Sequence, residues 1–569
     1  KKLEGFITLY KKGDTDLFAE ISADKLNKPF LISISLARGT AQGYLMAGMT
    51  IGNSLYYWKD ADKKVFLIEK NVHHTANSSD PINKAVEEGF QDSIIAAFPV
   101  KAKTGGNILI DLSDFLFTDY PEFGSMLGGY SIDTSRTTWG LTKNFPMNTE
   151  IEVNATYRGR GDSSMSNTVP DPRSVSIVTR YSFSQVPNTG YKKRVADDRI
   201  GYFLTAQMDY SMKTSREPFQ RFVHRWNLQK ADPSAEMSPP KKPIVFYIDK
   251  NVPYEYRPAV QAGILEWNKA FEKAGYINAI EVRFQEDDAE WDAEDVRYNT
   301  VRWMTGEAGF AIGPSRANPE TGEIYDADVL VDSGWLNYFQ WQYETTIHPS
   351  TPGKVDYNQL SEKNPQNWQT FVNQLRGIPG ETENPPAMDS RWKERLEEQR
   401  CEYAAGFRQQ LCLAAVADLV KGATPSKNGV LQDFLYQGLK NLITHEVGHT
   451  LGLRHNFKSS AMIALKDLFD KEKAEKQGLI GSVMDYDLCV IAPPGQEQGY
   501  YFSPTVGAYD LLAIQYGYKE CSDDDLKKLA ATASQSPYLY GTDGDVGLGV
   551  DPLTQTRDMS DDPIAWADM

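Results

Sequence analysis

The sequence predicts an α+β fold in which a β-rich domain precedes a second domain with a mixed sheet and a long helix. Two observations support this prediction. Residues 1 to 185 contain short β-branched segments bounded by turn residues, whereas the chain after residue 243 alternates strand and helix patterns. A proline-rich linker at 231–243 separates the two parts, so we predict domains at 1–230 and 244–569.

Several segments of the N-terminal domain have the length and apolar composition of strands. They are Phe6–Tyr10, Phe30–Ser35, Lys64–Ile68, Asn107–Asp111, Glu150–Thr156 and Ser174–Tyr181. Turn sequences such as Asn188–Gly190 bound some of them, which favours an antiparallel sheet or sandwich. A short helix is expected at Asp80–Phe90. The basic, aromatic stretch Tyr191–Lys230 has two interpretations: packing against the neighbouring domain, which we favour, or a strap across a cleft.

After the linker, a strand at Ile244–Ile248, a helix at Arg257–Ala274 and a strand at Ile280–Phe284 form a predicted βαβ unit. The helix has one apolar stripe, made by Val260, Ile264, Trp267 and Phe271. Further strands are expected at Thr300–Met304 and Ile324–Asp332. An insertion follows at about 336–428 and contains a long amphipathic helix, Ser390–Leu419.

The next helix, expected to begin near residue 430, carries the sequence H-E-x-x-H-x-x-G-x-x-H. Positions i and i+4 of a helix share a face, so His445 and His449 can offer imidazole nitrogens to one metal ion. Glu446 lies beside them, where it can take a proton from water. Gly452 can adopt the left-handed conformation that ends a helix and returns His455 as a third ligand. Three protein ligands and one open position are typical of catalytic zinc.

A second motif, Ser482-Val-Met-Asp-Tyr486, follows this helix. Together the two motifs resemble those of the metzincin metallopeptidases, and the resemblance covers about Lys242–Lys519. Met484 corresponds to the methionine of the Met-turn beneath the metal, and Tyr486 to a tyrosine that astacin-like and serralysin-like members place beside it. The alternative for Tyr486 is a ring packed in the core with its hydroxyl bound to backbone. Ala508–Gly517 is similar to the helix that closes the serralysin-type domain.

The resemblance implies a metzincin-like zinc peptidase domain with a twisted mixed sheet, an active-site helix and a Met-turn. The implied function is a zinc-dependent endopeptidase with one catalytic Zn²⁺, Glu446 as general base and Tyr486 as an oxyanion donor. Ile324–Asp332 resembles the edge strand of the cleft, so Asp326, Ala327 and Asp328 are expected to bind a peptide substrate. The whole arrangement resembles bacterial metalloproteases that are secreted, periplasmic or attached to the cell surface.

The alternative from another class is a surface adhesin or a glycan- or protein-binding protein with a non-catalytic metal site. The intact set of three histidines and Glu446 argues against a decayed site. A net charge of −17 excludes nucleic acid as a partner. No apolar run approaches the ~18 residues of a transmembrane segment.

Two further features leave their interpretation open. Asp543, Asp545 and Asp551 lie in a glycine-rich stretch that suits Ca²⁺ or, as the favoured interpretation, a solvated acidic loop. The first cysteine is Cys401, so residues 1–240 cannot provide a thiolate to the metal. We therefore expect that any latency depends on an aspartate, the segment Tyr191–Lys230 or the insertion, and not on a cysteine.

Overall fold

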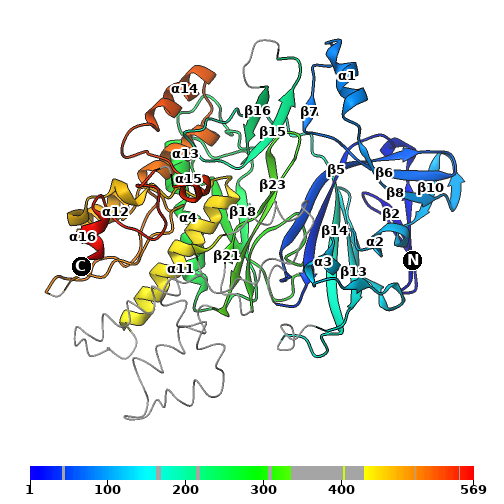
Figure 1. The fold of residues 1–569 in the computed structure, drawn as a ribbon, viewed down its shortest axis with the longest axis horizontal. Coiled ribbons are helices and arrows are strands. Elements are labelled where there is room, and N and C mark those ends of the chain that lie inside the picture. The colour runs from blue at the N-terminus through cyan, green and yellow to red at the C-terminus, as the bar shows by residue number, and fades with distance from the viewer. Residues whose placement is uncertain are drawn as a thin grey trace.

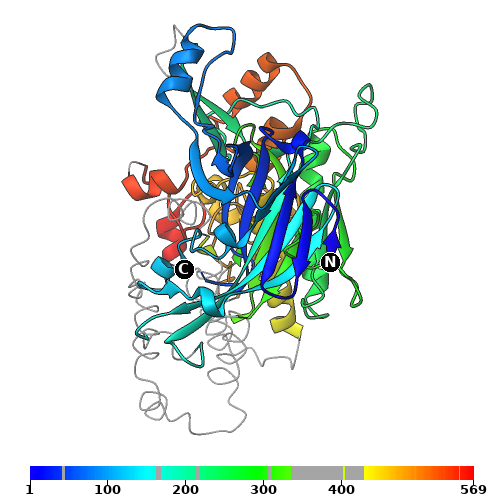
Figure 2. The ribbon, with the colours of Figure 1, turned by 90° about the vertical axis from the view of Figure 1, so that its right-hand side faces the viewer.

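The computed structural model describes residues 1–41, 45–161, 168–212, 218–305, 311–334, 401–403, 429–493, 495–549 and 551–568. Figure 1 shows the N-terminal strands on one side, a second sheet in the middle and the C-terminal helices on the far side. The turned view in Figure 2 places the blue and cyan strands in front of the green strands of the second sheet. The fold is therefore two β-structures side by side, with the helices on the side away from the N-terminal domain.

Antiparallel pairing builds two sheets around the N-terminal core. The smaller sheet has the order β1-β2-β3-β10-β9, with β1 Lys2–Leu3, β2 Thr8–Lys12, β3 Asp16–Ile21, β10 Asn107–Asp111 and β9 Ala102–Thr104. The larger has the order β11-β13-β14-β4-β5-β6-β8, with β11 Ser131–Ile132, β13 Asn148–Arg158, β14 Ser174–Gln185, β4 Phe30–Arg38, β5 Thr50–Asp60, β6 Lys64–Glu69, β8 Ser93–Pro99, and β12 Thr138–Asn144 beside β13.

Short helices complete this part: η1 Ala23–Lys25, α1 Ile82–Gly89, α2 Ser113–Leu116, α3 Phe123–Met126 and η2 Thr134–Arg136. Each predicted strand overlaps an observed one, namely β2, β4, β6, β10, β13 or β14, and the predicted helix is α1. The strands that were not predicted, such as β5, carry polar and aromatic residues in mixed order, which obscures the alternating pattern.

The stretch between the two predicted domains packs against the second one. A small sheet has the order β16-β15-β7, with β16 Phe219–Val223, β15 Leu204–Asp209 and β7 His74–Thr75. Tyr202, Val223 and Leu228 are nevertheless buried in the core of the second domain. The linker is also held in place, because isolated bridges join Lys230 to Pro240 and Ser238 to Tyr276. The favoured interpretation of this stretch, packing against its neighbour, agrees with these contacts.

The second domain is built on a sheet with the order β17-β23-β20-β18-β19, in which all these pairings are parallel. Its strands are β17 Arg225–Trp226, β23 Glu323–Asp332, β20 Asn299–Met304, β18 Ile244–Ile248 and β19 Ile280–Phe284, with β21 Ala311–Ile312 and β22 Ser315–Ala317 antiparallel to β23. The predicted βαβ unit is β18, α4 Arg257–Glu266, α5 Asn268–Lys273 and β19.

The remaining helices are α11 Gly429–Thr450, η5 Ser460–Met462, η6 Leu465–Asp467, α12 Lys471–Gln477, α13 Ala508–Tyr518, α14 Asp523–Thr532, α15 Asp543–Leu548 and α16 Pro563–Ala567. The predicted helix at 257–274 is divided at Trp267, and its whole apolar stripe is buried. Within the described residues, no helix combines the length and the apolarity that crossing a membrane requires.

The prediction that Ile324–Asp332 is an edge strand is wrong. β23 lies between β20 on one side and the segment of β21 and β22 on the other, so its backbone is paired along both edges. Asp326 forms a buried ion pair with Arg316, and Asp328 accepts hydrogen bonds from Thr300. Asp326, Ala327 and Asp328 are therefore structural residues of the sheet. The antiparallel strands β21 and β22, too short for the sequence pattern to reveal, lie outside β23.

The N-terminal domain covers this side of the second sheet. Met304, Ile312 and Leu330 belong to the second domain but pack in the N-terminal core. The Asn53 side-chain amide donates to the carbonyl of Ala317 at 2.6 Å, so β5 is bonded to β22. A shared apolar core and direct hydrogen bonds therefore hold the two domains in one relative position.

Most of the predicted insertion at 336–428 lies outside the described residues, and so does most of the predicted helix Ser390–Leu419. Within the predicted helix, the structure describes only Cys401–Tyr403. The backbone at Cys401 and Glu402 is not helical, so a continuous helix through these positions is wrong. The N–H of Glu402 donates to the hydroxyl of Tyr486, a bond that an N–H in the middle of a helix could not make.

Candidate metal centre

Helix α11 carries the H-E-x-x-H sequence into the centre of the second domain. It packs closely on α4, since a Cβ on Gly263 would lie 2.7 Å from the Lys440 carbonyl. The indole of Trp267 donates to the Thr444 carbonyl at 2.8 Å and fixes the rotation of α11. This packing buries His445 and Glu446 completely.

Three imidazoles converge beside α11, and each is oriented by a hydrogen bond on its Nδ1. His445 bonds the Val483 carbonyl at 2.7 Å, His449 the Leu453 carbonyl at 2.8 Å, and His455 the Asp543 carboxylate at 2.8 Å. Carbonyl and carboxylate oxygens only accept, so Nδ1 carries the proton and Nε2 presents its lone pair. The Nε2 atoms of His449 and His455 are 3.2 Å apart. This donor set fits a metal ion bound by three imidazoles.

Burial keeps the imidazoles of His445 and His449 neutral. Desolvation, followed by the neighbouring histidines, lowers the pKa of His445 well below its usual value and that of His449 to about 3. A histidine binds metal through a neutral ring, so a buried site of this kind is ready to coordinate a cation at neutral pH.

Gly452 ends the helix in the way the sequence predicts. Its φ is +97°, in the left-handed region that favours glycine, and a Cβ there would lie 2.0 Å from the His224 carbonyl. The N–H of Phe203 donates to the Gly452 carbonyl at 2.8 Å, and the Arg454 N–H donates to the Gly201 carbonyl at 3.1 Å. The returning chain is therefore held by the segment 201–224, and this turn brings His455 to the other two histidines.

Met484 packs against Gly448 of α11, which lies between His445 and His449 in the sequence. It is fully buried, and its sulfur would be 2.2 Å from a Cβ on Gly448 of α11. Asp510 of α13 holds the turn, because its carboxylate accepts from the Ser482 hydroxyl at 2.5 Å and the Val483 N–H at 2.8 Å. The predicted closing helix is thus the support of the turn. It also orients His445, whose acceptor is the Val483 carbonyl.

Tyr486 lies beside the cluster with its ring centroid 4.7 Å from that of His455. Its hydroxyl accepts a hydrogen bond from the Glu402 N–H at 2.7 Å. This state corresponds to the alternative interpretation, in which the hydroxyl is bound to backbone. Accepting this bond leaves the O–H proton of Tyr486, which is the group that an oxyanion donor would use.

Glu446 adjoins the cluster, and its two carboxylate oxygens are buried without a hydrogen-bond partner among the described residues. Burial raises its pKa to about 8, although the nearby Cys401 thiol and Gly313 N–H oppose the shift. A buried, unpartnered carboxylate is costly to stability, and such groups concentrate at functional sites.

Cys401 is the residue that sequence reasoning missed. Its sulfur lies 3.4 Å from Nε2 of His445, and the potential ligand atoms of Cys401 and the three histidines all lie within 4.8 Å of one another. The sequence-based expectation considered only a thiolate from residues 1–240, whereas the cysteine near the histidines belongs to the predicted insertion. A cysteine separated by dozens of residues from the histidines, inside a predicted insertion, gives no local signal of this contact.

The acidic residues considered for calcium have separate protein partners. Asp543 bonds His455, Asp545 accepts from the Thr542 N–H, and Asp551 forms an ion pair with Lys458. Across the described part of the chain, the group of side chains with metal-ligand spacing is Cys401 with the histidines. Asp543 is thus an orienting partner of a predicted zinc ligand.

Replacing Asp543 by alanine is expected to lower zinc affinity by about 10–100-fold, because the acceptor that orients His455 is lost. Competition with a chromophoric chelator measures this. Asp545→Ala is the matched control, since Asp545 lies in the same first turn of α15 and caps that helix without touching a histidine. Equal losses in both variants would mean that helix α15, and not the carboxylate of Asp543, sets the affinity.

Comparison with known families agrees with this geometry. Residues 427–569 match the family model described as Met-zincin, and residues 48–231 match a Domain of unknown function (DUF5117). No curated protein and no solved structure matches the chain. The chain therefore carries a Met-zincin domain behind a domain of unknown function, and the prediction of a metzincin of this arrangement is confirmed. The Met-zincin match indicates a zinc metallopeptidase.

Proposed function

We propose that this protein is a zinc-dependent endopeptidase, with His445, His449 and His455 as the zinc ligands and Glu446 as the general base. The observation that carries the proposal is the convergence of three imidazoles, each fixed by its Nδ1, beside a buried carboxylate that has no hydrogen-bond partner among the described residues. When bound, zinc would polarise the peptide carbonyl and lower the pKa of water.

Glu446 does the proton transfer in this proposal. Its buried carboxylate accepts the proton of the attacking water and then donates it to the leaving amine. The same burial excludes competing water and strengthens the electrostatic interactions in the site. Met484 and Asp510 take no part in the chemistry but hold the loop whose carbonyl orients His445.

The strand segment at 311–317 lies between the predicted base and the N-terminal domain. It crosses α11 at Glu446, since a Cβ on Gly313 would lie 2.1 Å from the Glu446 carbonyl, and Ile312 and Ala317 contact the N-terminal domain. The choice of a peptide as substrate therefore rests on the Met-zincin match and not on an open sheet edge.

The test of the proposed function combines metal analysis with hydrolysis. The purified chain is expected to bind one zinc per molecule and to cleave casein or an internally quenched peptide, with loss on chelation and recovery on adding zinc. A chain that binds zinc but cleaves no peptide under any activating condition would contradict an endopeptidase and favour the binding-protein alternative.

Replacing Tyr486 by phenylalanine tests whether its hydroxyl stabilises the oxyanion. The ring packing against His455 and Phe457 is retained, so zinc content is expected to stay the same. Loss of an oxyanion donor is expected to lower kcat by about 10²–10³-fold with little change in KM. An unchanged kcat would mean that the hydroxyl serves only its bond to the Glu402 N–H.

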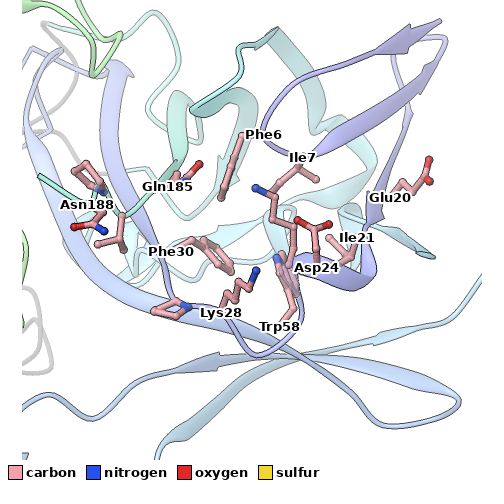
Figure 3. Close-up of a pocket in the computed structure, with 14 residues that line it drawn as sticks. Phe6, Ile7, Glu20, Ile21, Asp24, Lys28, Phe30, Trp58, Gln185 and Asn188 are labelled. Carbon is pink, nitrogen blue, oxygen red and sulfur yellow. The ribbon is translucent and has the colours of Figure 1, made fainter. Parts of the chain in front are cut away.

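The alternative of a binding protein draws no support from a cavity in the N-terminal domain. Figure 3 shows this cavity, of about 500 Å³, with Phe30 and Trp58 among its lining residues. An aromatic side chain that binds a sugar needs one solvent-exposed ring face. Trp58 is only 2% exposed, and its ring stacks on that of Phe30 with centroids 5.5 Å apart. The alternative stays a prediction that the hydrolysis assay decides.

A further inference from the structure

Three consecutive residues of the predicted insertion, Cys401–Tyr403, occupy the metal centre. Together they contact two members of the predicted machinery, His445 and Tyr486. Cys401 places its sulfur 3.4 Å from His445 Nε2, and the Glu402 N–H donates to the Tyr486 hydroxyl at 2.7 Å. The Tyr403 ring stacks on the His445 ring with centroids 4.7 Å apart and planes 10° apart. The Cys401 thiol is therefore one of several contacts that this segment makes with the site.

Hydrogen bonds beyond the site hold this segment in place. The Tyr403 hydroxyl donates to Asn441 of α11 at 2.9 Å and lies 2.5 Å from the Asp487 carboxylate. Cys401 and Tyr403 are both buried in the core of the second domain. Cys401 is not part of a disulfide, so its thiol is free to bind a metal.

We propose that Cys401 is a fourth ligand of the zinc ion and that this arrangement is a latent state of the enzyme. The inference rests on the proposed function. On coordination the S–H bond of Cys401 breaks, its proton passes to the solvent, and the sulfur donates the remaining electron pair. A zinc ion with four protein ligands has the closed coordination of a structural site, so no position remains for water or a substrate carbonyl.

The same segment contacts the other two groups that catalysis needs. The Tyr486 hydroxyl accepts from the Glu402 N–H and keeps its own O–H proton to donate. The Glu446 carboxylate lies next to the Cys401 thiol. Cys401 therefore has to leave the metal before water or a substrate carbonyl can bind there.

X-ray absorption on the zinc-loaded chain tests the ligand directly and needs no activity. We expect one sulfur at about 2.3 Å beside nitrogen ligands. Cobalt substitution should add a thiolate-to-cobalt charge-transfer band in the near ultraviolet. Cys401→Ser should remove both signals, whereas Cys489→Ser, which replaces another buried cysteine of this domain, should keep them. A wild-type spectrum with only nitrogen and oxygen ligands overturns the proposal, even if the variant fails to fold.

Peptide hydrolysis then tests latency. Cys401→Ser is expected to raise the rate of peptide hydrolysis by about tenfold or more. This follows if about nine-tenths of the wild-type molecules are in the closed state, since only about a tenth can then bind substrate. Sulfur coordination with equal hydrolysis by wild type and Cys401→Ser would overturn latency. Sulfur coordination with no hydrolysis by either protein would keep Cys401 as a ligand and contradict the proposed peptidase, so the two failures are distinguishable.

Discussion

Glu446→Gln is expected to bind zinc stoichiometrically and to lose turnover by about 10²–10⁴-fold, the usual contribution of a general base. Glutamine has the size of glutamate but cannot accept the proton of the attacking water. The buried carboxylate has no hydrogen-bond partner among the described residues, so the variant breaks no observed bond and should fold. The measurements are zinc content and kcat, each made in the wild-type chain and in a Cys401→Ser background.

A matched control exists in Glu266→Gln. Glu266 is also a buried carboxylate of the second domain, but it is paired with Lys440 and accepts from Thr505, away from the histidines. Its replacement should lower thermal stability and leave kcat unchanged. Turnover close to wild type in zinc-loaded Glu446→Gln would exclude Glu446 as the base.

His455→Ala is expected to lower zinc affinity by more than about 100-fold, because loss of only an outer partner of a ligand already costs about 10–100-fold. Without His455, the site keeps two imidazoles and, in the latent state, the sulfur of Cys401. Dialysed protein should then contain little zinc, and hydrolysis should fall with the metal.

His224→Ala controls for the loss of a buried imidazole. Burial lowers the pKa of His224 to about 4, and its ring bonds Thr205 rather than the cluster. This variant should keep its zinc although it loses stability. Unchanged metal content in His455→Ala would mean that the third protein ligand is another residue, and the metzincin arrangement of ligands would be wrong.

The elements that could be predicted are those whose pattern is local. The strand at Ile244–Ile248 and the strand at Ile280–Phe284 have the predicted bounds, because a continuous apolar run in the first and an alternating pattern in the second are both local strand signals. The pairing of strands was not predictable in the same way. β21 has only two residues, yet it and β22 move Ile324–Asp332 from the edge of the sheet to its interior.

The sequence by itself determined the candidate ligands His445, His449 and His455, with Glu446 and Gly452 between them. Helix geometry relates these positions within a few turns, and a left-handed glycine is a local requirement. Only the tertiary structure decided which residues surround them. Asp543 orients His455, Asp510 supports the Met484 turn, and Cys401 enters the cluster. These contacts join distant parts of the chain through packing, which the spacing of residues along the sequence does not encode.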